Sequence, residues 1–110
     1  MDKLIIIPSL GRACLKDIVG QIREDIRNSG QYVRVMIALN GERTPFIDKL
    51  NVEISHVANR PIGVGAAMNL ALSNINDTLI WTVADDETWL NGKIKHDLEN
   101  FNEILKGKIL

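Results

Sequence analysis

Three consecutive acidic residues, Asp85, Asp86 and Glu87, are the side chains in this sequence best placed to do chemistry. They directly follow residues 78–84, an apolar and β-branched run that predicts a buried strand. Ligands of α/β sheets bind at the carboxyl ends of strands, so we expect these carboxylates at the mouth of a site. Clustered carboxylates there favour a hard divalent cation and, through it, a phosphate group. The simpler interpretation is a helix N-terminus, which favours acids in any case.

The elements that must position these acids alternate between strand and helix signals along the chain. Strand patterns cover residues 4–7, 32–39, 52–57 and 78–84. Helical patterns cover residues 15–29, a short turn that Thr44 is expected to cap with Pro45 in its first position, residues 63–73 and residues 90–105. This order predicts a single-domain α/β fold with a mostly parallel, Rossmann-like sheet of about four strands flanked by helices. Residues 107–110 have the composition of a further strand start.

The turns that follow the four strands are expected to meet at one edge of this sheet. They comprise residues 8–12, 40–43, 59–65 and 85–87, where polar residues and glycines concentrate. Gly63 and Gly65, next to Ala66 and Ala67, allow the chain to approach a ligand or another backbone closely. The sequence therefore predicts that the ligand site lies at this edge.

Composition narrows the function classes without choosing one. The 110 residues carry a net charge of −1 with no basic block, so nothing indicates nucleic acid or an anionic membrane as partner. One cysteine, Cys14, excludes an internal disulfide and a cysteine-rich zinc site, and favours a reducing compartment. The apolar run at residues 4–7 is too short for a signal peptide or a membrane span. We therefore expect a cytoplasmic protein without a membrane segment.

Three segments, in this order, resemble the family 2 type of GT-A glycosyltransferases. Residues 5–12 (IIIPSLGR) look like that family's opening strand and turn. Asn59, with residues 63–69 (GVGAAMN), is similar to its pattern of Asn, Gly, Ala and Asn, and residues 80–87 (IWTVADDE) resemble its strand ending in the acidic metal motif. The resemblance spans almost the whole chain and implies a truncated GT-A nucleotide-binding half.

The resemblance implies a nucleotide-diphosphate sugar as donor, with a UDP-sugar as the first candidate, and Mn²⁺ or Mg²⁺ at the acidic motif. Such a metal neutralises the charge that develops on the departing nucleotide. It implies Asp85 and Asp86 as catalytic residues, with Asp86 and Glu87 toward the metal and Asp85 toward the ribose or sugar; the motif can also be aligned across Asp85 and Glu87. The implied nucleotide-binding residues are Pro8, Ser9, Arg12, Asn40, Asn59, Gly63, Ala67, Asn69 and Asp85.

The chain departs from the family pattern at several positions. The family's base-contacting acid is replaced by Leu39 and Asn40, so the base stays open, although the amide of Asn40 can still bind a base edge. Met68 stands where the family often has Arg. One helix follows the acidic motif, so no residue is assigned as the general base for an unknown acceptor. We expect a second copy or a partner chain to complete the acceptor site.

Two other functions remain open from the sequence: a non-catalytic nucleotide-sugar-binding module, and an interaction protein on the same fold. Individual side chains also keep two interpretations. Trp89 covers a sugar or anchors the last helix, and Asn69 contacts a ligand or bonds within its own turn. Trp81 is expected in the core, and neither His56 nor His96 is expected to bind metal.

Overall fold

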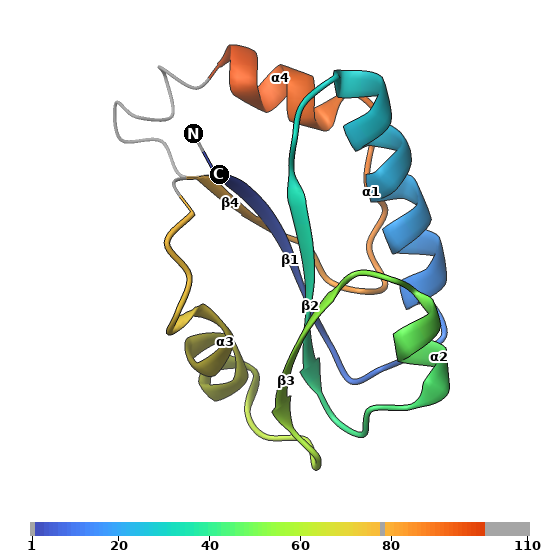
Figure 1. Cartoon of the computed structure of the whole chain (residues 1–110), viewed down its shortest axis with the longest axis vertical. Helices are drawn as coiled ribbons and strands as arrows, with labels where there is room; N and C mark the ends of the chain where they lie inside the picture. Colours follow the sequence, from blue (N-terminus) through green and yellow to red (C-terminus); the bar gives the residue numbers. More distant parts are fainter. Residues whose placement is uncertain (1, 78, 101–110) are drawn as a thin grey trace.

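The computed structural model describes residues 2–77 and 79–100, which form a parallel sheet with helices on both faces (Figure 1). The elements in chain order are β1 (Lys3–Ser9), α1 (Leu15–Ser29), β2 (Arg34–Asn40), α2 (Pro45–Lys49), β3 (Glu53–Ala58), α3 (Val64–Leu72), β4 (Leu79–Thr82) and α4 (Lys93–Glu99). The sheet has four strands in the order β3-β2-β1-β4, and every pairing is parallel. The predicted α/β, Rossmann-like class is confirmed.

The strand order reverses direction at β1. From β1 the chain steps outward to β2 and β3 on one side, and then returns to place β4 on the other side. In open α/β sheets the crevice for ligands lies at such a reversal, outside the carboxyl ends of the two strands concerned. The turns after β1 and β4, which carry Arg12 and the acidic residues, therefore flank the expected crevice.

The two faces of the sheet bury separate apolar clusters because successive strand residues point to opposite sides. Ile5 and Ile7 of β1 pack with the apolar stripe of α1 and with Trp81 and Trp89, and this cluster is the larger one. Leu4 and Ile6 face the other way, toward Ala71 of α3. Helices α1, α2 and α4 thus cover one face and α3 covers the other (Figure 1).

Several boundaries differ from the sequence-based expectation. β1 continues through Pro8 to Ser9, and β2 begins at Arg34, leaving Tyr32 81% exposed. Thr44 precedes α2, but its side chain makes no capping hydrogen bond, so its expected capping role is wrong. The last helix begins at Lys93 and not at Leu90, because Gly92 adopts φ 95° before it. Residues 101–110, including the expected helix positions Phe101, Ile104 and Leu105 and the expected strand start at 107–110, lie outside the described residues.

None of the helices in residues 2–77 and 79–100 has the length and apolar content needed to cross a bilayer.

Replacement by alanine is expected to have opposite effects at Gly20, inside α1, and at Gly30, the residue that follows its end. Gly30 ends the helix at φ 67°, so Gly30→Ala forces a side chain into the left-handed region and is expected to destabilise the protein by about 1 kcal/mol. Gly20 lies inside the helix with no atom within 4 Å of an added Cβ, so Gly20→Ala is expected to stabilise it by about 0.5–1 kcal/mol. Urea unfolding measures both, and effects of the same sign would contradict the α1 boundary.

Candidate functional site

A pocket of about 300 Å³ opens at the carboxyl edge of the sheet, where the strand order reverses. Its volume is at the lower end of the range for small-molecule sites. All four expected turns contribute to its lining, which consists of Pro8, Ser9, Leu10, Arg12, Asn40, Ile62, Val64, Ala67, Ala84 and Asp85. Six of the implied site residues therefore lie around one pocket: Pro8, Ser9, Arg12, Asn40, Ala67 and Asp85.

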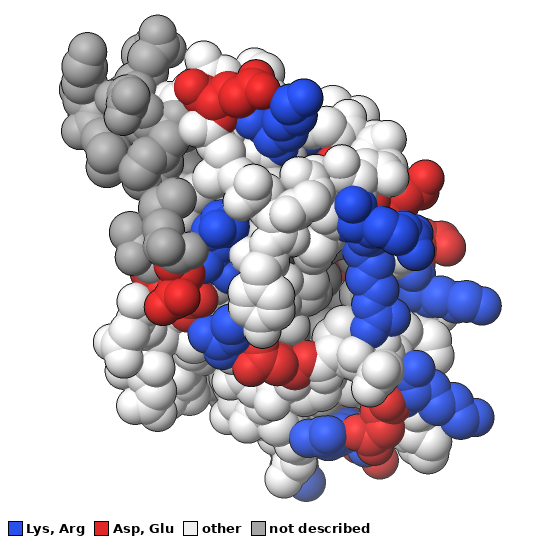
Figure 2. All heavy atoms as spheres, turned by 45° about the horizontal axis from the view of Figure 1, so that its top comes forward, with Lys and Arg blue, Asp and Glu red and all other residues white. Residues whose placement is uncertain are grey.

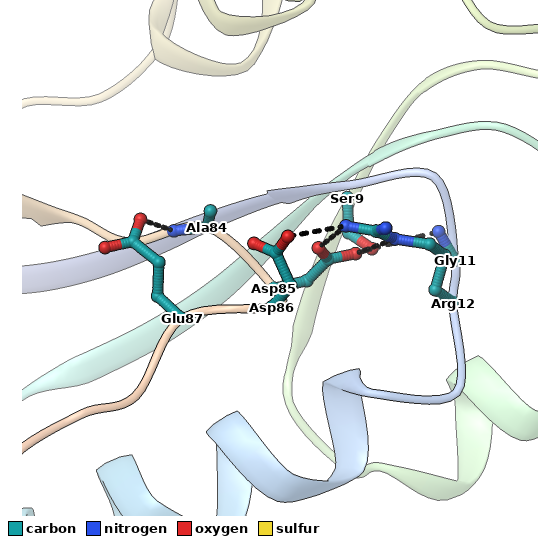
Figure 3. A network of polar contacts seen from close by, with 7 residues as sticks. All are labelled: Ser9, Gly11, Arg12, Ala84, Asp85, Asp86 and Glu87. Carbon is teal, nitrogen blue, oxygen red and sulfur yellow. Dashed lines mark hydrogen bonds and ion pairs between the residues drawn. The ribbon is translucent and has the colours of Figure 1, made fainter.

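Asp85 is the buried charge of this pocket, with 3% of its surface exposed. Its Oδ2 accepts hydrogen bonds from Ser9 Oγ at 2.6 Å and from Arg12 Nε at 3.1 Å, and its Oδ1 accepts one from Arg12 Nη2 (Figure 3). Ser9 Oγ in turn accepts from the backbone N–H of Gly11 at 3.0 Å. The turn after β1 and the end of β4 are thus tied together across 73 residues of sequence.

The surroundings of Asp85 favour its ionised form. Burial alone raises the pKa of a carboxyl group, but hydrogen bonds from Arg12 and Ser9 and the charge of Arg12 outweigh burial here. The pKa of Asp85 therefore lies below its ordinary value of 3.8. The same contact raises the pKa of Arg12. At neutral pH the pocket contains a buried carboxylate paired with a half-exposed guanidinium.

This pairing predicts how stability depends on pH. A carboxylate with a lowered native pKa stabilises the fold fully above its unfolded pKa, and this stabilisation is lost as the pH falls through the native value. Asp85→Asn is therefore expected to cost about 2 kcal/mol at pH 6, and less as the pH falls below 3.8. Urea unfolding of both proteins between pH 2 and 6 measures this difference. A constant difference across that range would contradict the pairing, and the exposed Asp86→Asn serves as control.

The other two acids lie outside the buried pair. Asp86 has a 63% exposed side chain, 3.7 Å from Arg12 Nη2. Glu87 turns back so that its Oε1 accepts the backbone N–H of Ala84 at 2.9 Å (Figure 3). Asp86 is therefore the most loosely held of the three carboxylates, with one long ion pair to Arg12 and no hydrogen bond to the backbone of the described residues. One guanidinium beside three carboxylates leaves this corner with a formal charge of −2.

Asn40 holds the far wall of the pocket. Its Nδ2 donates to the carbonyl of Ile62 at 2.7 Å, and its Oδ1 accepts the N–H of Ile62 at 2.8 Å. A primary amide has two donors and two acceptor positions, so one of each remains. Asn40 is 4% exposed, and its main structural effect is to fix the loop that leads into α3.

Gly41 permits the first two turns to touch. A Cβ at this position would lie 2.9 Å from the carbonyl oxygen of Leu10, too close for any side chain without a backbone shift. The carbonyl of Gly41 also lies 2.8 Å from His56 Nε2. The Asn-Gly pair predicted a turn here, but the close approach to the first turn depends on the fold and had no local signal.

Three of the nine implied nucleotide-binding residues are not part of the pocket lining. Asn59 is exposed in the loop after β3, and Asn69 is exposed on α3. Gly63 is the N-cap residue of α3, between the lining residues Ile62 and Val64, and it is itself exposed. The structure therefore brings together the first turn, Asn40, Ala67 and Asp85, but not these three.

A buried acid that the sequence did not single out, Asp25, holds residues 89–94, the segment between the acidic turn (residues 85–87) and α4. Asp25 of α1 is 1% exposed and accepts hydrogen bonds from Trp89 Nε1 at 2.8 Å, from the N–H of Gly92 at 2.7 Å and from the N–H of Ile94 at 3.1 Å. Gln21 Oε1 accepts the N–H of Trp89 at 2.8 Å. Trp89 is therefore a buried anchor of the segment before α4. Trp81 lies in the core, as expected, in edge contact with Trp89.

The described residues contain no group of three or more His, Cys, Asp or Glu side chains arranged to hold a metal ion. Asp85 is engaged by Arg12 and Ser9, and Glu87 by a backbone N–H. Magnesium at nucleotide sites often needs only one or two carboxylates, because phosphate oxygens and water fill the other positions. These carboxylates therefore fit a metal ion that would enter bound to a diphosphate and be held by Asp86. They do not fit a site in which protein side chains alone surround the ion.

Comparison with known proteins adds no relative. A scan against protein-family models, a search of curated proteins and a search of solved structures each return no match to this chain.

Proposed function

We propose that the pocket binds the nucleotide part of a nucleotide-diphosphate sugar, and that the chain is a glycosyltransferase or its donor-binding portion. The observation that carries this proposal is the position of Asp85: a buried, ionised carboxylate lining an apolar pocket at the point where the strand order reverses. The resemblance of residues 5–12, 63–69 and 80–87 to family 2 GT-A enzymes agrees with this position.

The walls of the pocket suit a flat base and the floor suits a hydroxyl. Leu10, Ile62 and Val64 line the pocket and are exposed to 53%, 38% and 68%, which offers apolar surface to an aromatic ring. Asp85 accepts three hydrogen bonds, and a carboxylate has about four acceptor positions. One position thus remains for a ribose or sugar hydroxyl.

Charge determines the requirement for a cation. A diphosphate next to a corner of formal charge −2 is repelled unless a cation lies between them. A bound Mn²⁺ or Mg²⁺ would supply Lewis-acid stabilisation of the leaving diphosphate. Asp86 would hold the ion, and Glu87 would join only after releasing the N–H of Ala84. Arg12 balances Asp85 and lines the pocket with a half-exposed side chain, so it would orient the diphosphate.

The acceptor side of the reaction stays open. No residue in the described part of the chain is assigned as a general base, and we propose that a second copy or a partner chain contributes it. A cytoplasmic location likewise remains a prediction.

The second candidate is a non-catalytic nucleotide-sugar-binding module. It is favoured by the engagement of Glu87 with the backbone of Ala84, which leaves Asp86, itself within 3.7 Å of Arg12 Nη2, as the one exposed carboxylate of the acidic turn without a backbone partner for a metal. Release of UDP from UDP-glucose, measured with and without Mn²⁺, separates the two. Metal-dependent release above the spontaneous rate supports the transferase. Binding of UDP-glucose and Mn²⁺ without release, in the presence of candidate acceptor sugars, supports the module.

A further inference from the structure

A second cavity, remote from the acidic turn, lies between α1 and α2 and has a volume of about 350 Å³. Its apolar floor consists of Val19, Phe46 and Leu50, and Val19 and Leu50 are almost fully buried. This groove lies on the α1 face of the sheet, whereas the pocket at the carboxyl edge of the sheet, where the nucleotide is proposed to bind, is lined by Val64 and Ala67 of α3. The two cavities therefore have separate walls.

Three cations surround the groove, and none of the described residues that line it is acidic. Lys16 and Arg23 come from α1, and Lys49 comes from α2. Within residues 2–77 and 79–100, neither Lys16 nor Lys49 forms an ion pair with a side chain. Figure 2 shows many Lys and Arg side chains along the side of the molecule formed by α1 and α2, with some Asp and Glu side chains among them. The groove thus concentrates positive charge in a protein whose net charge is −1.

Arg23 is held in place at the rim. Its Nη2 donates to the carbonyls of Leu50 and Asn51, both at 2.6 Å, at the end of α2. These bonds satisfy the carbonyls of the C-cap residue and of the residue after it, and they fix the guanidinium without neutralising its charge. The nearest acid of α2, Asp48, is paired with Arg43 instead. A ligand anion would therefore meet a fixed guanidinium and two ammonium groups that form no ion pair with the described side chains.

Gly20 keeps the groove open. It lines the groove in the interior of α1, where glycine costs roughly 0.5–1 kcal/mol relative to alanine. An added Cβ would meet no atom within 4 Å, so packing among the described residues does not require a glycine here. The absence of a side chain at this position leaves space for a ligand to approach the helix backbone.

We propose that this groove is a second ligand site, which binds a small soluble organic anion: a phosphate or carboxylate group attached to an apolar body. The cations match the anionic group and the floor matches the apolar body. None of the six exposed large hydrophobic side chains among the described residues lines this groove, so no apolar side chain projects from it to insert into a bilayer. The concave shape and the missing protrusion favour a dissolved ligand over a lipid surface.

The test is a titration of the ¹⁵N-labelled chain with phenyl phosphate, followed by amide chemical shifts. Saturable shifts are expected at Gly20 and Leu50, with inorganic phosphate and phenol each binding at least roughly fivefold more weakly. Affinity should fall with added salt, because exposed charges are screened. Shifts centred on Asn40 and Ala67, or no saturable shift at millimolar phenyl phosphate, would overturn the proposal.

Two variants keep the test specific. Gly20→Leu fills the groove at a position that tolerates a side chain, so it should weaken phenyl phosphate at least roughly tenfold while the midpoint of thermal unfolding stays level or rises. The double substitution Lys16→Gln with Lys49→Gln should weaken it roughly fivefold or more, whereas Lys95→Gln on α4 should not. Unchanged binding in Gly20→Leu would exclude the groove. The proposal would also fail if the chain did not bind phenyl phosphate but sedimented with phosphatidylglycerol vesicles, and if Gly20→Leu sedimented equally well. The cations would then be assigned to a membrane surface.

Discussion

Asp86→Ala is expected to weaken metal-dependent nucleotide binding by at least roughly 100-fold while leaving the fold intact. Asp86 is the one carboxylate of the acidic turn that is both exposed and without a backbone partner, so it is the proposed ligand of the cation. Loss of an outer-shell partner of a metal ligand already costs about 10- to 100-fold in affinity, and loss of the ligand itself should cost more. Calorimetric titration of UDP in the presence of Mn²⁺ measures the change.

A matched control for this variant is Glu99→Ala, which removes an exposed carboxylate at the end of α4. It should leave UDP affinity unchanged. Binding of UDP to Asp86→Ala with the affinity of the parent chain would show that the cation, if bound, has another ligand. Asp86→Asn should retain part of the affinity, because an amide oxygen still coordinates a hard cation without its charge.

Asp25→Ala is expected to cause the largest loss of stability, about 3 kcal/mol or more. The substitution leaves Trp89 Nε1 and the N–H groups of Gly92 and Ile94 without their acceptor, and each buried unsatisfied donor costs about 1–3 kcal/mol. Such a loss is a substantial fraction of the 5–15 kcal/mol typical of a folded domain. Urea unfolding, followed by the fluorescence of the two tryptophans, measures it directly.

Glu24→Ala removes the neighbouring acid of α1, which is exposed, and should change the free energy of unfolding by less than about 0.5 kcal/mol. Asp25→Asn keeps the shape and part of the acceptor capacity, so its cost should lie between the two. Equal stability of the Asp25→Ala and Glu24→Ala variants would contradict the anchoring of the segment before α4. The acidic turn would then be held by Ser9 and Arg12 alone.

Local patterns predicted the elements that bury apolar surface. The helical spacing of Leu15, Ile18, Val19 and Ile22 predicted α1 with its observed bounds, and the β-branched run before Asp85 predicted β4. The start of α4 was missed because Gly92 adopts a left-handed conformation after Asn91, although Asn-Gly is a turn signal that favours a later start.

Contacts between distant segments were not predictable in the same way. The pairing of Arg12 with Asp85 joins residues 73 positions apart, and only the neighbouring positions of β1 and β4 in the sheet create it. Asp25 did carry a signal, because it lies three residues after Ile22 on the buried stripe of α1, where an acid needs hydrogen-bond donors. Those donors come from residues 89–94 and are visible only in the fold.

The same distinction applies to the candidate site. Parallel strands place their carboxyl ends at one edge, so the gathering of four turns followed from element order alone. Which of the three acids is buried did not follow, because this depends on the contacts made by Ser9 at the end of β1 and by Arg12 in the turn after it. Sequence also did not distinguish the three asparagines: Asn40 is buried and holds the loop before α3, whereas Asn59 and Asn69 are exposed.

The most direct test of the central proposal is calorimetric titration of the folded chain with UDP, GDP and CDP, each with and without Mn²⁺. We predict that one nucleotide binds, that its binding needs the cation, and that Asp85→Asn weakens it by removing the charge that the pocket offers to a hydroxyl. Absence of binding for all three nucleotides at millimolar concentration, with Mn²⁺ present and the fold verified by circular dichroism, would contradict a donor site in this pocket.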